Sequence, residues 1–183
     1  MRGRRTLGQH RISGKLLSSQ ISCSASGETS DTRIRCGEIK IFKTTLMENK
    51  PKVGVGVIVI KDGKILLGKR KNAHGEGAWC YPGGHLEYGE SWEECSRREV
   101  MEEAGIQIKN LRFGTATNDI FENEQKHYIT ICMVADFASG EVRVMEPYKC
   151  EEWRWVEWDK LPQPLFLPTI NQLKAGFNPL NPS

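Results

Sequence analysis

The sequence predicts a single α/β domain, of the α+β kind, that follows a basic N-terminal extension. Its 183 residues suit one domain of ordinary size, and residues 52–71 and 91–105 carry strand and helix signals. Hydrophobic residues make up 38% of the chain and charged residues 27%, as in globular proteins. The composition argues against a largely disordered chain or a fibrous repeat. We place the extension at residues 1–50 and the domain at residues 51–183.

The domain begins with a predicted β-hairpin. Two β-rich runs joined at Asp62-Gly63 make up residues 52–71, KVGVGVIVIKDGKILLGKRK. An Asp-Gly pair between apolar runs is a strong hairpin signal. A loop is expected at residues 74–79, before the Gly-rich segment CYPGGHLEYGE.

A helix is predicted from Trp92 to about Ala104. Ser91, with Glu94 three residues later, forms a capping-box pattern that satisfies free backbone donors at a helix start. Gly105 stands where a left-handed residue would end the helix.

Apolar alternation, proline and glycine predict the remaining elements. Strands are expected at residues 111–117, 127–137 and 153–158, with a polar loop at residues 118–126. The tail has a proline-rich loop and then a short helix at residues 169–175, which Gly176 ends.

The first 50 residues differ from the rest in charge. They hold ten Lys and Arg against four Asp and Glu, whereas residues 51–183 hold sixteen against nineteen. Residues 1–27 contain four arginines, one lysine, six serines and no acid, which resembles an organelle transit peptide. A disordered tail or an upstream extension of the reading frame is the alternative, with Met47 as a start for a shorter product. We expect a cytoplasmic protein, with a mitochondrion or plastid as the alternative.

Two classes of partner are excluded by charge and hydropathy. A slightly acidic domain lacks the broad basic face that binds a nucleic-acid polymer, although phosphate chemistry at a small site stays open. The longest apolar stretch, Val53–Ile60, has eight residues, whereas a membrane-spanning helix needs about 20. We therefore expect no nucleic-acid polymer and no membrane as a partner.

The six cysteines are scattered, without a CxxC pair and without histidines at zinc-ligand spacing. We interpret them as reduced thiols that pack as small apolar residues. They are Cys23, Cys36, Cys80, Cys95, Cys132 and Cys150.

Three glutamates on the predicted helix carry the main functional signal. Glu99, Glu102 and Glu103 are spaced i, i+3 and i+4, which places them on one helix face. Like charges at this spacing destabilise a helix, and acids near its C-terminal end oppose the helix dipole, so a cation should compensate. Carboxylate oxygens favour a hard ion, Mg²⁺ or Mn²⁺. Taken alone, the glutamates fit a solvated acidic face better.

The residues around the glutamates complete a longer motif. The segment resembles the Nudix box, G-x5-E-x7-R-E-U-x-E-E-x-G-U with U aliphatic, and every fixed position matches. These positions are Gly84, Glu90, Arg98, Glu99, Val100, Glu102, Glu103, Gly105 and Ile106. Nine constrained positions in 23 residues make the match highly specific.

The resemblance implies the Nudix fold, a mixed β-sheet sandwiched between α-helices, and Mg²⁺-dependent hydrolysis of a nucleoside diphosphate linked to another group. In that family the carboxylates at the positions of Glu99, Glu102 and Glu103 hold the metals, and one glutamate activates water. The carbonyl of Gly84 is a further candidate ligand. Clustered metal ions neutralise phosphate charge and supply a nucleophile, which agrees with these roles.

Arg98 is expected to pair with Glu90 or a neighbouring glutamate and to fix the loop against the helix. The alternative is an ordinary surface ion pair, which contributes little. The turn Pro82-Gly83-Gly84 would let the backbone approach metal and phosphate closely, which a Cβ atom would obstruct.

Assignments outside the box rest on position alone. Glu146 matches a region where some Nudix triphosphatases supply a further metal ligand, with Glu151 and Glu152 as competitors or all three as surface acids. His85, Lys69 and Arg70 face either phosphate or solvent. A base pocket needs an aromatic or apolar slot with a few polar groups. The candidates are Thr117, Asn118, Phe121, His127 and Tyr128, each of which is otherwise a turn or core residue.

The segments LLGKRK, PGGHLEYGESWEEC and EPYKCEEWRWVEWDKLPQPLF narrow the resemblance. They are most similar to MutT-type nucleoside triphosphate diphosphatases, namely the plant cytosolic Nudix hydrolase and its animal relative that acts on 8-oxo-dGTP and thiopurine nucleotides. One departure is Cys80-Tyr81 before Pro82, where relatives usually carry a leucine before the proline, which changes the expected pocket shape.

This resemblance implies release of pyrophosphate from (d)NTPs, including 8-oxo-dGTP, for nucleotide-pool sanitation. Dihydroneopterin triphosphate and NADH or another dinucleotide are alternative substrates. A non-catalytic nucleotide-binding module is a remote alternative, which the intact glutamates disfavour. Close relatives include homodimers, so a homodimer is an open expectation.

Overall fold

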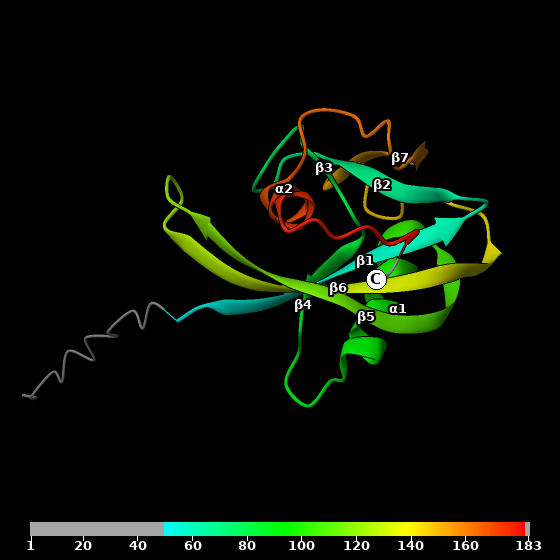
Figure 1. Cartoon of the computed structure of the whole chain (residues 1–183), viewed down its shortest axis with the longest axis horizontal. Helices are drawn as coiled ribbons and strands as arrows, with labels where there is room; N and C mark the ends of the chain where they lie inside the picture. The colour runs from blue at the N-terminus through cyan, green and yellow to red at the C-terminus, as the bar shows by residue number, and fades with distance from the viewer. Residues whose placement is uncertain (1–49, 182–183) are drawn as a thin grey trace, which may run out of the picture. The chain divides into compact units, whose positions relative to one another are not determined.

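All seven strands of the described residues, 50–181, belong to one mixed sheet in this computed structural model (Figure 1). The strands are β1 (Lys52–Lys61), β2 (Lys64–Arg70), β3 (Trp79–Cys80), β4 (Gly83–His85), β5 (Ile106–Phe121), β6 (Lys126–Gly140) and β7 (Cys150–Glu157). Neighbouring strands follow the order β3-β2-β1-β6-β5, with β4 paired to β1 and β7 paired to β2. Only the β1–β6 pair is parallel among these pairings. The predictions for the N-terminal extension concern residues outside the described range.

A helix covers each face of the sheet. Helix α1 (Trp92–Ala104) packs through Cys95, Val100 and Ala104 onto a core that includes Val57 and Met133. On the other face, helix α2 (Leu167–Lys174) packs through Ile170 and Leu173 onto a second core. That core is made of Ile58, Ile65, Leu67, Trp79, Tyr81, Cys132, Val134, Val156 and Leu165. The expected sheet sandwiched between helices is confirmed.

Helix α1 has the bounds and caps that the sequence predicts. The Ser91 hydroxyl accepts a hydrogen bond from the backbone N–H of Glu94 at 3.2 Å, and the Glu94 carboxylate accepts one from the Ser91 N–H at 2.8 Å. Gly105 ends the helix at φ 69°, in the left-handed region that glycine adopts at little cost. The box glutamates therefore lie on a helix whose two ends are fixed locally.

The predicted loop at residues 118–126 is wrong, because β5 and β6 are longer than expected. β5 continues to Phe121, and only residues 122–125 turn before β6 begins. Thr117, Asp119 and Phe121 are buried in alternation with exposed neighbours, as in a strand with one face against the interior. Polar residues in this segment suggested a loop. Thr117 and Asp119, however, are buried and hydrogen-bonded to each other, so the strand continues through them.

Other boundaries shift by a few residues. The last strand, β7, begins at Cys150 rather than at residue 153, and α2 begins at Leu167 rather than at residue 169. Pro168 lies in the first turn of α2, where a missing N–H costs nothing. Residues 74–79 form the expected loop, except that Trp79 begins β3. The Asp62-Gly63 turn has φ values of 50° and 71°, as a tight hairpin requires.

The four described cysteines, Cys80, Cys95, Cys132 and Cys150, are free thiols, as expected. Cys23 and Cys36 lie outside the described residues. Among the described residues, none of the helices is long and apolar enough to cross a membrane.

Candidate active site

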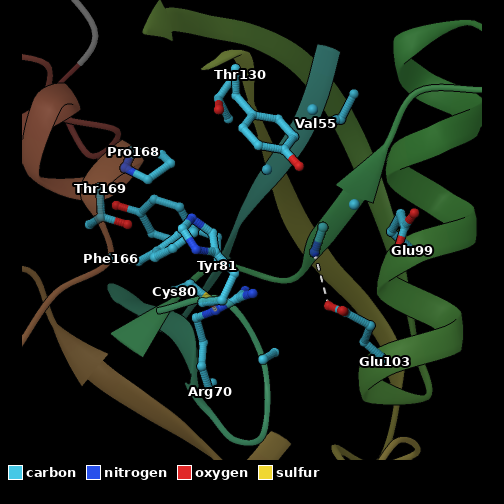
Figure 2. A pocket seen from close by; sticks show the side chains of 18 of the residues that line it. Val55, Arg70, Cys80, Tyr81, Glu99, Glu103, Thr130, Phe166, Pro168 and Thr169 are labelled. Atoms are coloured by element: carbon cyan, nitrogen blue, oxygen red, sulfur yellow. Dashed lines mark hydrogen bonds between the residues drawn. The ribbon is translucent and has the colours of Figure 1, made fainter. Parts of the chain in front are cut away.

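A pocket of about 590 Å³ receives residues from both helices and from all seven of the described strands. Figure 2 shows Glu99 and Glu103 from α1 on one side, and Tyr81, Phe166, Pro168 and Thr169 on the other. Ten sequence-predicted site residues line it. They are Lys69, Arg70, Gly84, His85, Glu99, Glu103, Thr117, Phe121, Tyr128 and Glu146. The pocket therefore joins an acidic side to an aromatic and polar side.

Glu103 is partly buried beside the first glycine of β4. Its Oε2 accepts a hydrogen bond from the Gly83 backbone N–H at 2.9 Å, the contact drawn in Figure 2. Burial, with Glu99 and Glu146 nearby, raises its pKa to about 7 despite that hydrogen bond. Near neutral pH this side chain is poised to accept a proton or, when deprotonated, to bind a cation.

Glu99 lies against Gly84 of β4. A Cβ atom on Gly84 would stand 2.2 Å from Glu99 Oε1, so only glycine allows this approach. Arg98 Nη1 donates to the same Oε1 at 2.7 Å. Burial raises the Glu99 pKa, and the Arg98 guanidinium opposes that shift. Two carboxylates with raised pKa values thus share the acidic side of the pocket.

Arg98 ties the loop after β4 to helix α1. Its guanidinium donates to both carboxylate oxygens of Glu90, at 2.8 and 2.9 Å, and to the His85 carbonyl at 3.2 Å. This two-pronged contact holds the pKa of Glu90 down at about 2. Neither Arg98 nor Glu90 lines the pocket, so their contacts orient the glutamate-bearing face from behind.

Glu102 points away from the pocket. Its side chain is 57% exposed, and its carboxylate pairs with Arg98 Nη1 at 3.4 Å. In the part of the chain that is described, no three His, Cys, Asp or Glu side chains are arranged to hold a metal ion. Using all three box glutamates as ligands therefore requires Glu102 to turn inward and Glu99 to share Oε1 with Arg98.

The donor set nevertheless fits a divalent cation in type and charge. Glu99 and Glu103 are partly buried, and Glu99 and Glu146 place like charges near Glu103, which disfavours the ionised forms. A bound cation would relieve that cost, and carboxylate oxygens are ligands that Mg²⁺ or Mn²⁺ accepts. The fit is one of ligand chemistry rather than of a preformed cage.

Of Glu146, Glu151 and Glu152, only Glu146 lines the pocket. Its carboxylate accepts from Lys149 Nζ at 2.9 and 3.0 Å and from the Tyr148 hydroxyl at 3.0 Å. Glu151 instead pairs with Lys69 at 2.9 Å, and Glu152 pairs with Arg154 at 2.8 Å. Lys149 also lines the pocket and was missed, although its position three residues after Glu146 could have indicated an ion pair.

The base-pocket candidates separate by strand face. Thr117, Phe121 and Tyr128 line the pocket, whereas Asn118 and His127 do not. Side chains alternate along a strand, so Asn118, next to Thr117, points to the opposite face. There its Oδ1 lies 2.5 Å from His127 Nε2. The structure therefore does not place Asn118 and His127, which were expected at the base pocket, among its lining residues.

An aromatic group that the sequence did not reveal stands beside Phe121. The His74 ring lies 4.1 Å from the Phe121 ring and 5.5 Å from the Phe166 ring, measured between centroids. Arg70 donates to the His74 carbonyl at 2.6 Å and stacks its guanidinium 4.4 Å from the Phe166 ring centroid. His74 lies in the 71–78 loop and Phe166 lies just before α2. Neither segment has a hydrophobic periodicity from which an inward-facing side could be predicted.

A buried polar network links this side of the pocket to α2. Asp119 is fully buried and accepts from Thr117 at 2.9 Å, Thr130 at 2.6 Å and Asn171 at 2.8 Å. Thr117 and Thr130 line the pocket, so Asp119 fixes the hydroxyls of two lining residues. Its role was missed because the sequence placed it in a loop.

Comparison with known families agrees with this geometry. The model of the NUDIX domain matches residues 50–176, which is more than half of the chain. This chain belongs to the Nudix family.

Several Nudix proteins are similar to it. NAD-capped RNA hydrolase NudC of Edwardsiella ictaluri is 35% identical over 107 residues, which cover 58% of this chain and 39% of that protein. The ADP-ribose pyrophosphatase of Methanocaldococcus jannaschii is 36% identical over 118 residues, covering 63% of this chain and 68% of that one. The match therefore spans about two fifths of the length of NudC but two thirds of the archaeal enzyme.

One solved Nudix structure matches this chain over nearly all of its own length. The MutT NUDIX hydrolase of Burkholderia pseudomallei superposes with a TM-score of 0.64 at 35% identity. The match covers 69% of this chain and 97% of that one. The Nudix fold assigned from the sequence is confirmed.

Proposed function

We propose that this protein is a Mg²⁺-dependent Nudix pyrophosphohydrolase that cleaves (d)NTPs, including oxidised ones such as 8-oxo-dGTP, to the monophosphate and pyrophosphate. The observation that carries the proposal is that two partly buried glutamates, Glu99 and Glu103, open into the same pocket as aromatic side chains. The first feature suits a phosphate-bound cation and the second suits a nucleobase. A single substrate can occupy both.

On the acidic side, Glu99, Glu103 and Glu146 are the residues that would hold the cation, with Glu102 joining after it turns inward. When bound, Mg²⁺ neutralises charge on phosphate oxygens and lowers the pKa of water. Glu103, which accepts from the Gly83 N–H at 2.9 Å on the acidic side of the pocket, is our candidate to take the proton of an attacking water. Arg98 keeps Glu99 in place through Oε1.

On the other side, Phe121, Tyr128 and Phe166 supply aromatic surface for a base. The Phe121 and Phe166 ring centroids lie 5.4 Å apart, and the Phe121 and Tyr128 centroids lie 6.0 Å apart. Thr117 and Thr130 add hydroxyls held by Asp119. This is the pattern of a ligand site with apolar walls and a few oriented polar groups.

A second candidate is hydrolysis of NADH or another dinucleotide. It is favoured by the similarity to proteins named NAD-capped RNA hydrolase and ADP-ribose pyrophosphatase. The same carboxylates would serve, because the bond broken is again a phosphoric anhydride. Products separate the two: a triphosphate releases pyrophosphate, whereas NADH or ADP-ribose releases AMP.

The test is product release by the full chain with Mg²⁺ from dGTP, 8-oxo-dGTP, dihydroneopterin triphosphate, NADH and ADP-ribose. Glu103→Gln is expected to lower turnover of the best substrate by about 10²-fold or more. Glu93→Gln is the matched control, because Glu93 is exposed on the same helix. Near-normal Mg²⁺-dependent activity of Glu103→Gln would refute the assignment, and AMP as the sole product would favour the dinucleotide alternative.

A further inference from the structure

Lys149 brings a positive charge to the acidic side of the pocket. Its Nζ donates to both carboxylate oxygens of Glu146, at 2.9 and 3.0 Å, and both residues line the pocket. Its charge also acts on the two box glutamates there. Burial raises the pKa of Glu99, and the charges of Arg98 and Lys149 oppose that shift. The hydrogen bond to Glu146 raises the pKa of Lys149, and the charge of Glu103 adds to the increase. Lys149 therefore lies within electrostatic range of all three pocket acids.

The backbone around this ion pair is fixed, whereas the ammonium group is more exposed. The Lys149 N–H donates to the Glu146 carbonyl at 2.9 Å, and the Lys149 carbonyl accepts from the Lys71 N–H at 2.8 Å. Just before this turn, the Met145 N–H donates to the Glu103 carbonyl at 3.1 Å, near the end of α1. The Lys149 side chain is 53% exposed, against 23% for Glu146. The ammonium can therefore move while the turn stays in place.

Two other basic residues of the pocket have different partners. Lys69 pairs with an exposed carboxylate on β7 at 2.9 Å. Arg70 places its charge near Glu103, but its Nε donates to the His74 carbonyl at 2.6 Å, away from the carboxylates. An ion pair with an exposed partner contributes little, so the contact between Lys149 and Glu146 is easily exchanged.

A divalent cation and the Lys149 ammonium would compete for the same carboxylate. Glu146 is a candidate ligand of that cation, and two cations beside one carboxylate repel each other. The other side-chain donor to Glu146, the Tyr148 hydroxyl at 3.0 Å, is neutral, so Lys149 is the charged partner that would give way. A lysine ammonium binds phosphate as a point charge. The phosphates of a nucleotide would lie on this side of the pocket, beside the cation.

We propose that Lys149 neutralises the pocket acids in the metal-free protein and exchanges partners, from the Glu146 carboxylate to a phosphate oxygen of the substrate, when a divalent cation takes that carboxylate. The inference rests on the proposed function, because it concerns the cation and the phosphates of the same reaction.

Metal affinity without substrate tests the first half of the exchange. The full chain is titrated with Mn²⁺, and free Mn²⁺ is followed by its paramagnetic resonance signal. Lys149→Met removes the competing charge and should bind Mn²⁺ about 3- to 10-fold more tightly. Lys149→Arg keeps the charge and should stay within about twofold of wild type. Lys160→Met is the matched control, because Lys160 pairs with Glu157, three residues before it, outside this pocket. It should leave the dissociation constant unchanged.

Pyrophosphate binding tests the second half. Calorimetric titration with inorganic pyrophosphate at saturating Mg²⁺ should give a dissociation constant about 3- to 10-fold larger for Lys149→Met than for wild type. Lys149→Arg and Lys160→Met should stay near the wild-type value. Opposite shifts in metal and pyrophosphate affinity indicate exchange, since an ordinary surface ion pair would change neither. If either affinity of Lys149→Met equals that of wild type, the inference is overturned.

Neither measurement requires turnover, so the two proposals can fail separately. Both shifts in a protein that hydrolyses none of the tested nucleotides would support the exchange by Lys149 and refute the hydrolase. Hydrolysis of a nucleotide together with unaltered affinities in Lys149→Met would support the hydrolase and refute the exchange.

Discussion

Replacing Asp119 with alanine should destabilise the protein although no charge partner is lost. Asp119 is fully buried on β5, and its carboxylate accepts three hydrogen bonds. Two come from strand hydroxyls, those of Thr117 and Thr130, and the third comes from Asn171 of α2. The side chain therefore joins β5, β6 and α2 in one network.

The magnitude follows from these contacts. A hydrogen bond to a charged group contributes about 1.5–3 kcal/mol, so three bonds set an upper limit well above one ordinary core substitution. The threonine hydroxyls line the pocket and can turn to water, and Asn171 is only partly buried, so much of that loss is recovered. We expect Asp119→Ala to lower the free energy of unfolding by about 2–4 kcal/mol.

Chemical denaturation of wild type and variant at constant pH measures this difference. Asp136→Asn serves as the control, because Asp136 also accepts from an amide, that of Asn110, but lies near the surface. It should change the free energy of unfolding by less than about 0.5 kcal/mol. If Asp119→Ala were as stable as Asp136→Asn, the network would carry no net stability and the reasoning would be refuted.

Two further predictions concern the site loop and pH. Gly84→Ala should lower Mg²⁺-dependent turnover by about 10²-fold, because the new Cβ atom would stand 2.2 Å from Glu99 Oε1 and must displace that carboxylate. Gly54→Ala is the control and should change turnover little, because its Cβ atom would meet its nearest neighbour at 3.6 Å. Equal activities of the two variants would contradict this. Burial and then Lys126 lower the His74 pKa, with Arg70 adding to the shift and Glu124 opposing it. The folded state therefore favours neutral His74. The protein should lose stability as pH falls through and below the ordinary histidine pKa of about 6.5. His74→Phe should therefore reduce the drop in melting temperature between neutral and acidic pH, and an unchanged pH profile would contradict the assignment.

The sequence predicted best the features that depend on short-range pairs. The capping box of Ser91 and Glu94, the left-handed Gly105 and the Asp62-Gly63 turn each involve residues within a few positions of one another. The motif places Glu99 and Glu103 for the same reason, because helix geometry fixes side chains three or four residues apart. In these segments, interactions between residues close in sequence are enough to fix the backbone conformation.

The errors arose where partners distant in sequence decide the outcome. The sequence around Asp119 predicts a loop, because its hydrogen-bond donor Asn171 is 52 positions away and cannot be inferred from local sequence. Glu102 shares a helix face with the other box glutamates, yet it points to solvent because the pocket wall stands opposite Glu99 and Glu103. Asn118 and His127 were assigned to the pocket from their place in the chain, whereas strand alternation turned them away.

Gly54 and Gly56 show how one strand can serve both core and pocket. Along β1, Val55, Val57 and Val59 pack into the core under α1, and Val55 also lines the pocket. The alternate positions point to the other face, where Ile58 joins the core under α2 but Gly54 and Gly56 line the pocket.

Both glycines leave room for ligand rather than for a backbone turn. Cβ atoms at Gly54 and Gly56 would meet their nearest neighbours at 3.6 and 3.9 Å, which is ordinary contact, so an alanine would fit. Larger side chains would enter the pocket, between the acidic side chains of α1 and the aromatic ones near α2. The bare stretch of β1 thus gives a substrate a path between the two sides of the pocket.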